Sequence, residues 1–123
     1  MFQRKIDRQT AEIYLRTPIC MIRHEYGGDE ELEDLQAKAA LRQTMIRARE
    51  ILPRCRQVFI GQRDLTLHDL DVRFVKLLLG MTRYLETGQY VKACEECVDV
   101  LHFFHVEDRR ILSILISLLE EYL

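Results

Sequence analysis

Residues 67–104 read LHDLDVRFVKLLLGMTRYLETGQYVKACEECVDVLHFF and contain the strongest folding signal in the chain. Apolar residues recur at intervals of three and four on both sides of Thr87 and Gly88. This interval matches the 3.6-residue turn of an α-helix, and glycine favours the end of a helix. The stretch therefore predicts two antiparallel helices joined by a tight turn.

The same periodicity extends upstream. It predicts a first helix over residues 4–26, with a kink or a late start at Pro18, because proline lacks the backbone N–H that a helix interior needs. A second helix should begin after Asp29, whose carboxylate can cap it, and should bend or restart at Pro53. Both segments add to the expected bundle.

The remaining boundaries follow from capping and hydropathy. Thr66 and Asp69 are three residues apart, like a capping box with Asp in place of Glu, and predict the start of a third helix. Residues 107–123 form a last helix that is apolar on nearly every side. We therefore expect an all-α fold, an antiparallel bundle of about five helices, as one domain over residues 1–123.

Composition narrows the functional classes. Eighteen basic and twenty acidic residues give a net charge of −2, so the chain has no overall positive field to attract nucleic acid or an anionic membrane. We expect neither a nucleic-acid partner nor insertion into a membrane. Four cysteines and no leader-like apolar segment favour free thiols in the cytoplasm, and no motif indicates a cofactor.

The last helix suggests a function. It offers more apolar residues than one stripe needs to pack on a small bundle, so one side should remain available for a partner protein or for a second copy of the chain. The residues that we expect at this surface are Leu112, Ile116 and Leu119, followed by Val75 and Leu79.

A metal site is a less favoured alternative. Cys94, Cys97, His102 and His105 are residue types that bind zinc. On one continuous helix, however, the outer two would lie about 16 Å apart along the axis, too far to reach one ion. Buried thiols and imidazoles near a helix end explain the same residues without a metal.

A second alternative is catalytic. Arg63 and His68 form an R-x4-H pattern, which resembles the signature of HEPN-type ribonucleases. The resemblance implies that this pair acts on RNA phosphates, with the two sites paired across a dimer axis. Asp69 follows the histidine, where that family often has an aromatic residue.

Two further resemblances concern binding proteins. Residues 45–101, from RAREILPRCRQVFIGQ to Ala93 and Leu101 in the following helix, resemble the second half of the flagellar secretion chaperones of the FliS family. Residues 77–101 also resemble one tetratricopeptide hairpin, in which a small alanine lets two helices approach. Both resemblances imply a surface that holds another protein. The sequence thus favours a non-enzymatic, cytoplasmic, protein-binding bundle, with a HEPN-like ribonuclease or a structural homodimer as alternatives.

Overall fold

A computed structural model describes residues 4–21, 30–56 and 71–123. These ranges contain no β-strand, so the prediction of an all-α bundle is confirmed. A short 3-10 helix, η1 (Leu52–Arg54), follows the second helix at Pro53, where we expected the helix to bend or restart. The α-helices are α1 (Arg8–Cys20), α2 (Glu30–Ile51), α3 (Val72–Glu86), α4 (Tyr90–Phe103) and α5 (Arg109–Tyr122).

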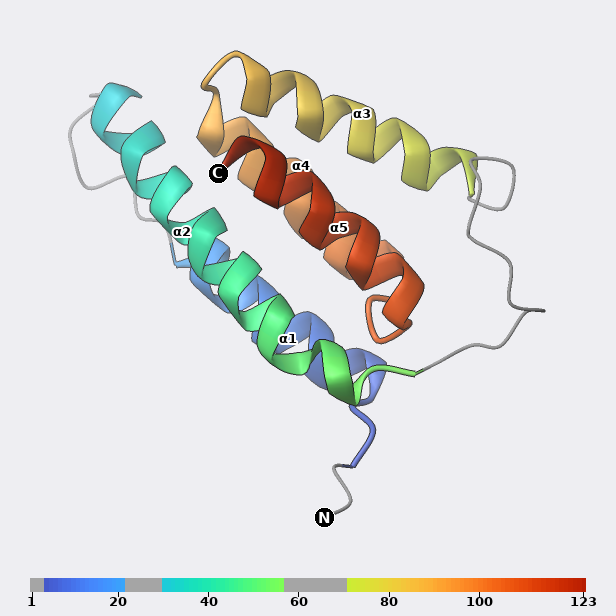
Figure 1. Cartoon of the computed structure of the whole chain (residues 1–123). Coiled ribbons are helices and arrows are strands. Elements are labelled where there is room, and N and C mark those ends of the chain that lie inside the picture. The colour runs from blue at the N-terminus through green and yellow to red at the C-terminus, as the bar shows by residue number, and fades with distance from the viewer. Residues whose placement is uncertain (1–3, 22–29, 57–70) are drawn as a thin grey trace.

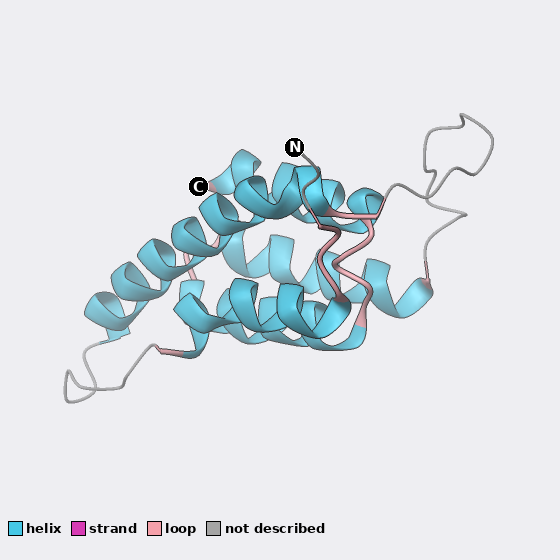
Figure 2. Ribbon diagram, turned by 90° about the horizontal axis from the view of Figure 1, so that it is seen from below, coloured by secondary structure: helices cyan, strands magenta, loops and turns pink. Residues whose placement is uncertain are grey.

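Helices α2 and α4 each pack against three other α-helices. Figure 1 shows α5 lying in front of α4, with α2 beside them and α1 behind α2, and Figure 2 shows the same stacking from below. Helix α4 contacts α1, α2 and α3, whereas α5 contacts α2 and α3. Helix α3 lies at the outside of the bundle and packs mainly on α4.

Helix α1 is shorter than predicted and contains Pro18 near its end. It begins after Asp7, whose carboxylate accepts a hydrogen bond of 2.8 Å from the backbone N–H of Thr10. Pro18 has no N–H to donate to the carbonyl of Tyr14, four residues earlier. The Arg47 side chain of α2 donates to that carbonyl instead, at 2.9 Å. The proline is therefore accommodated inside the helix, because a neighbouring helix supplies the missing donor.

Helix α3 starts later than the capping pattern predicted. Its N-cap is Asp71, which accepts a hydrogen bond of 2.8 Å from the N–H of Arg73, so the helix begins at Val72. Thr66 and Asp69 lie outside the described residues. Because Asp71 has an extended backbone, the helix that carries Phe74, Met81 and Leu85 does not run continuously from Thr66.

The tight turn between α3 and α4 is confirmed. Gly88 adopts φ of 73°, a left-handed conformation that glycine accepts without strain. The N–H of Gln89 donates to the carbonyl of Tyr84 at 2.8 Å and closes the turn. Helix α4 then runs back along α3.

Three distant segments meet at one end of the bundle. The N–H of Ile6 donates to the carbonyl of Arg54 at 3.0 Å. The N–H of Arg56 donates to Glu107 at 2.7 Å, and the N–H of Arg109 donates to Arg56 at 3.0 Å. These backbone bonds fix the position at which α5 starts.

Candidate partner-binding surface

The structure corrects the expected surface of the last helix. Leu112 and Leu119 are 0% exposed and Ile116 is 6% exposed, so all three belong to the hydrophobic core. Ile111, Ile114 and Leu118 are half-buried against the same core. The expectation that Leu112, Ile116 and Leu119 remain free is wrong for this fold, because α5 packs against α2, α3 and η1 and these residues lie in the core.

The other two predicted residues lie on a different helix, α3, and are more accessible. Leu79 is 63% exposed and Val75 is half-buried. Val72, which the sequence reasoning did not select, is 67% exposed. The spacing of residues 72, 75 and 79 places them along one side of a helix. We call these three residues the α3 stripe.

The α3 stripe exists because α3 is packed on one side only. Phe74, Met81 and Leu85 point into the core, with at most 3% of each residue exposed. The opposite side carries the stripe and faces away from α4 and α5. Phe74 also contacts Phe104 edge-to-face, with ring centroids 5.0 Å apart, which anchors the first turns of α3 to the end of α4.

Basic side chains accompany the α3 stripe. Lys76 lies one turn after Val72, and Arg83 lies one turn after Leu79, so both are on the same side of the helix as the stripe. Both residues are exposed. The acidic Glu86 at the end of the helix accepts a hydrogen bond of 2.8 Å from the hydroxyl of Tyr122 and is held against α5. The outer side of α3 is thus apolar with a basic edge.

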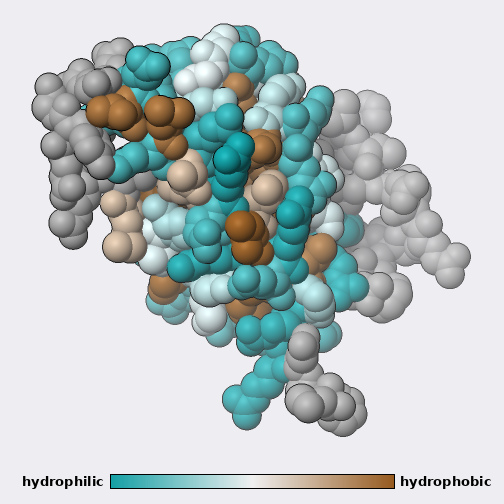
Figure 3. Space-filling model, turned by 60° about the vertical axis from the view of Figure 1, so that its left-hand side comes forward, coloured by the Kyte–Doolittle hydropathy of each residue, from teal (hydrophilic) through white to brown (hydrophobic). Residues whose placement is uncertain are grey.

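Exposed apolar residues also occur on α2, within α1 and just after it, and at the end of α4. The face shown in Figure 3, on the α2 side of the molecule, has separate apolar groups divided by hydrophilic side chains. The remaining large apolar residues that are exposed in the described part of the chain are Ile13, Met21, Leu32, Leu35, Ile46 and Phe103.

The structure does not bring the four candidate zinc ligands together. Cys94 and Cys97 are buried in the core, and burial raises the pKa of the Cys97 thiol to about 12. His102 lies 2.7 Å from a carboxylate oxygen of Glu12, and His105 lies 3.1 Å from one of Glu107. No cluster of three or more such ligands occurs in the described residues.

The candidate ribonuclease pair, Arg63 and His68, lies outside the described residues.

In the ranges that the structure describes, we find no helix with the length and apolar character of a membrane span.

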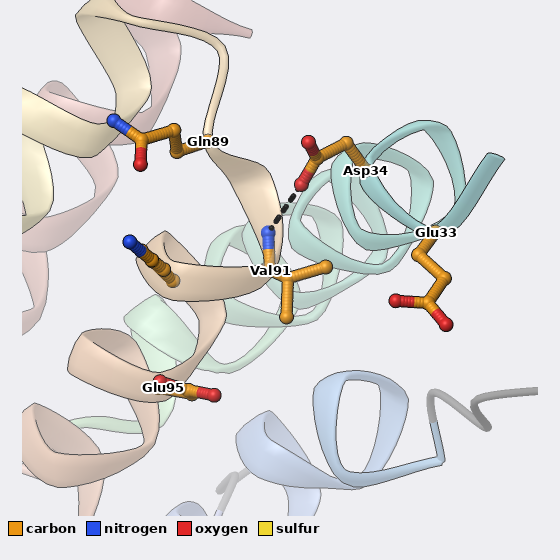
Figure 4. A pocket seen from close by; sticks show the side chains of 6 residues that line it. Glu33, Asp34, Gln89, Val91 and Glu95 are labelled. Atoms are coloured by element: carbon orange, nitrogen blue, oxygen red, sulfur yellow. Dashed lines mark hydrogen bonds between the residues drawn. The ribbon is translucent and has the colours of Figure 1, made fainter. Parts of the chain in front are cut away.

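An acidic hollow of about 310 Å³ lies between α2 and α4. Figure 4 shows Asp34 of α2 reaching toward the first turn of α4, where its carboxylate accepts a hydrogen bond of 3.0 Å from the N–H of Val91. Glu33 and Glu95 point in different directions and do not converge on one point in the hollow. Because Asp34 acts as a cap for α4, the hollow has a structural explanation.

A second hollow, of about 420 Å³, lies between the N-terminal ends of α3 and α5. The two helices converge at their C-terminal ends, where Tyr122 meets Glu86, and separate toward their starts. We call this the α3/α5 hollow. Its lining residues are Arg56, Asp71, Phe104, His105, Glu107, Asp108, Arg110 and Ile111.

Each helix start beside this hollow has the same Asp-x-Arg arrangement. Asp71 accepts hydrogen bonds from the backbone and the guanidinium of Arg73, and these bonds hold the pKa of Asp71 below its usual value. Asp108 accepts the corresponding bonds from Arg110. Both carboxylates are therefore fully engaged by their own helices. Sequence analysis missed this pair, although the repeated spacing is visible in the sequence.

A comparison of the chain with protein-family models, curated proteins and solved structures found no match. The geometry of the α3 stripe and of the α3/α5 hollow is therefore the basis for a functional interpretation.

Proposed function

We propose that this chain is a non-enzymatic, protein-binding helical bundle that holds an amphipathic helix of a partner protein against the outer side of α3. The observation that carries the proposal is the α3 stripe. Two large aliphatic residues, Val72 and Leu79, are 67% and 63% exposed and lie two turns apart on one side of a helix that is otherwise well packed. Helices recognise each other through anchors with this spacing.

The basic edge of α3 defines the chemistry of the partner. Lys76 and Arg83 would favour a helix that has apolar residues three and four apart and glutamate or aspartate along one side. A second copy of α3 fits less well, because an antiparallel pair would place Lys76 of one copy near Arg83 of the other. Charge complementarity therefore favours a different protein over a homodimer.

The likeness of residues 45–101 to secretion chaperones extends this proposal, because that range includes α3 and most of α4. On this basis we propose that the partner is an export substrate bound in the cytoplasm. Four free cysteines fit a reducing compartment.

A designed peptide tests the docking surface. We would use a labelled amphipathic helix with leucines on one side and glutamates along one edge, and measure its binding by fluorescence anisotropy. Leu79→Asp should weaken binding at least about tenfold, because it places a charge in an apolar contact. The matched control is Leu35→Asp, since Leu35 is 58% exposed on α2 and should have no role.

A second peptide, with lysines in place of the glutamates, should bind less tightly than the first. Equal binding of both peptides, or equal weakening by Leu79→Asp and Leu35→Asp, would contradict the proposal. Sedimentation equilibrium would identify the homodimer instead, if the wild type is dimeric and Leu79→Asp is monomeric. RNA cleavage that is lost in His68→Ala would identify the ribonuclease.

A further inference from the structure

The α3/α5 hollow contains an acceptor without a donor. Glu107 is a buried residue, with 6% of its side chain exposed. One carboxylate oxygen, Oε1, lies 3.1 Å from Nδ1 of His105. The other, Oε2, is buried and has no hydrogen-bond partner. A carboxylate oxygen in this position is costly unless a donor reaches it, so it indicates a ligand that carries N–H groups.

No neighbouring cation fills this role. Arg110 is bound to Asp108 through two contacts, of 3.4 and 3.2 Å. Arg109, on the same turn, donates to the carbonyl of Pro53 at 3.1 Å through one terminal amino group, and its buried Nε makes no hydrogen bond. Three carboxylates and two guanidinium groups line the hollow, so the carboxylates outnumber the guanidinium groups by one.

The walls of the hollow also have an apolar part. Phe104 and Ile111 line it next to the charged groups. A ligand with an aliphatic stem and a cationic end would place the stem against these two residues and the N–H groups toward Glu107. Arginine and lysine side chains have this form. The volume of about 420 Å³ is ample for either.

We propose that the α3/α5 hollow binds a basic side chain, arginine or lysine, of the partner protein, with Glu107 as its acceptor. The inference rests on the proposed function, because Asp71 lines the hollow and directly precedes Val72, the first residue of the α3 stripe. A partner helix on the stripe would therefore place its end beside the hollow. The apolar stripe gives contact area, and the hollow selects for a basic residue at one position.

The test separates the hollow from the stripe. We would titrate the isotope-labelled protein with N-acetyl-arginine methylamide, with its lysine counterpart, and with the neutral isostere N-acetyl-citrulline methylamide, and follow the backbone amides by NMR. The basic probes should shift the amides of residues 104–111, and the citrulline probe should bind about tenfold or more weakly, because it lacks the charge. Shifts elsewhere, or equal binding of arginine and citrulline probes, would overturn the proposal.

Variants add a second readout. Glu107→Gln should remove the preference for arginine over citrulline, whereas Glu121→Gln, at an exposed position on α5, should leave it unchanged. If Glu107→Gln does not fold, the comparison of the three probes on the wild type decides the question. Leu79→Asp should retain binding of the arginine probe. If the wild type binds the arginine probe but not the designed peptide, only the proposed function is refuted. If it binds the peptide but not the probe, only the basic-side-chain site is refuted.

Discussion

Truncation of Leu119 tests whether the last helix is core or surface. Leu119 is 0% exposed and belongs to the hydrophobic core, so Leu119→Ala removes buried methyl groups and leaves a cavity. Such changes cost about 2–5 kcal/mol of the free energy of unfolding. Leu79→Ala removes the same atoms from a side chain that is 63% exposed, and should cost less than about 0.5 kcal/mol.

Urea denaturation followed by circular dichroism at the helix band would measure this difference. With a slope of about 1–3 kcal/mol per molar urea, a loss of about 2–5 kcal/mol at Leu119 lowers the midpoint by at least about 0.7 M, whereas a loss of less than about 0.5 kcal/mol at Leu79 lowers it by less than about 0.5 M. If the two variants have the same midpoint, Leu119 is not in the core. In that case the last helix would again be available as a partner surface.

Four further predictions concern local features. Gly88→Ala should lower the free energy of unfolding by about 1 kcal/mol, because φ of 73° strains any residue with a Cβ. The control is Gly80→Ala, where a Cβ would be 3.5 Å from a carboxylate of α4; this change should be neutral or stabilising. Thermal melts would measure both changes. Asp34→Ala should cost about 0.5–2 kcal/mol, measured by urea midpoint, because it removes a cap from α4. A thiol reagent at pH 8 should modify the exposed Cys20 in the native protein and the three buried thiols only after unfolding. Because the pKa of Cys97 rises from 9.0 to about 12 on folding, the unfolded chain loses this proton first, so stability should be constant below about pH 9 and fall as the pH approaches 12. A urea midpoint that is higher at pH 10 than at pH 8 would contradict that sign.

Periodicity and turn chemistry predicted much of the fold. The interruption at Thr87 and Gly88 located the α3–α4 turn, because a glycine with positive φ closes it. The start of α3 was misplaced, since both Thr66 and Asp71 are good capping residues and only the backbone conformation decides between them. The position of Pro18 inside α1 could not be predicted either. The hydrogen bond that the Tyr14 carbonyl lacks because of this proline is supplied by Arg47, which is far away in the sequence.

The candidate surface was harder to predict than the fold. Leu79 and Leu119 are equally apolar and both lie on amphipathic helices. The hydropathy pattern does not determine which of these helices lies at the outside of the bundle. Burial depends on how many neighbours a helix has, and α5 has more of its sides covered than α3. The unpartnered oxygen of Glu107 is a tertiary feature as well, since it arises where the segment before α5 meets residues near Arg56.

The cap that α4 receives from α2 has a consequence for the order of folding. Gln89, at the N-cap of α4, makes no capping bond with its side chain, and the acceptor for Val91 comes from Asp34, 57 residues earlier in the chain. The first turn of α4 therefore frays as an isolated segment and becomes stable only when α2 docks. During synthesis α2 emerges before α4, so the Asp34 carboxylate is present when the first turn of α4 forms. The formation of α4 is therefore coupled to its packing against α2.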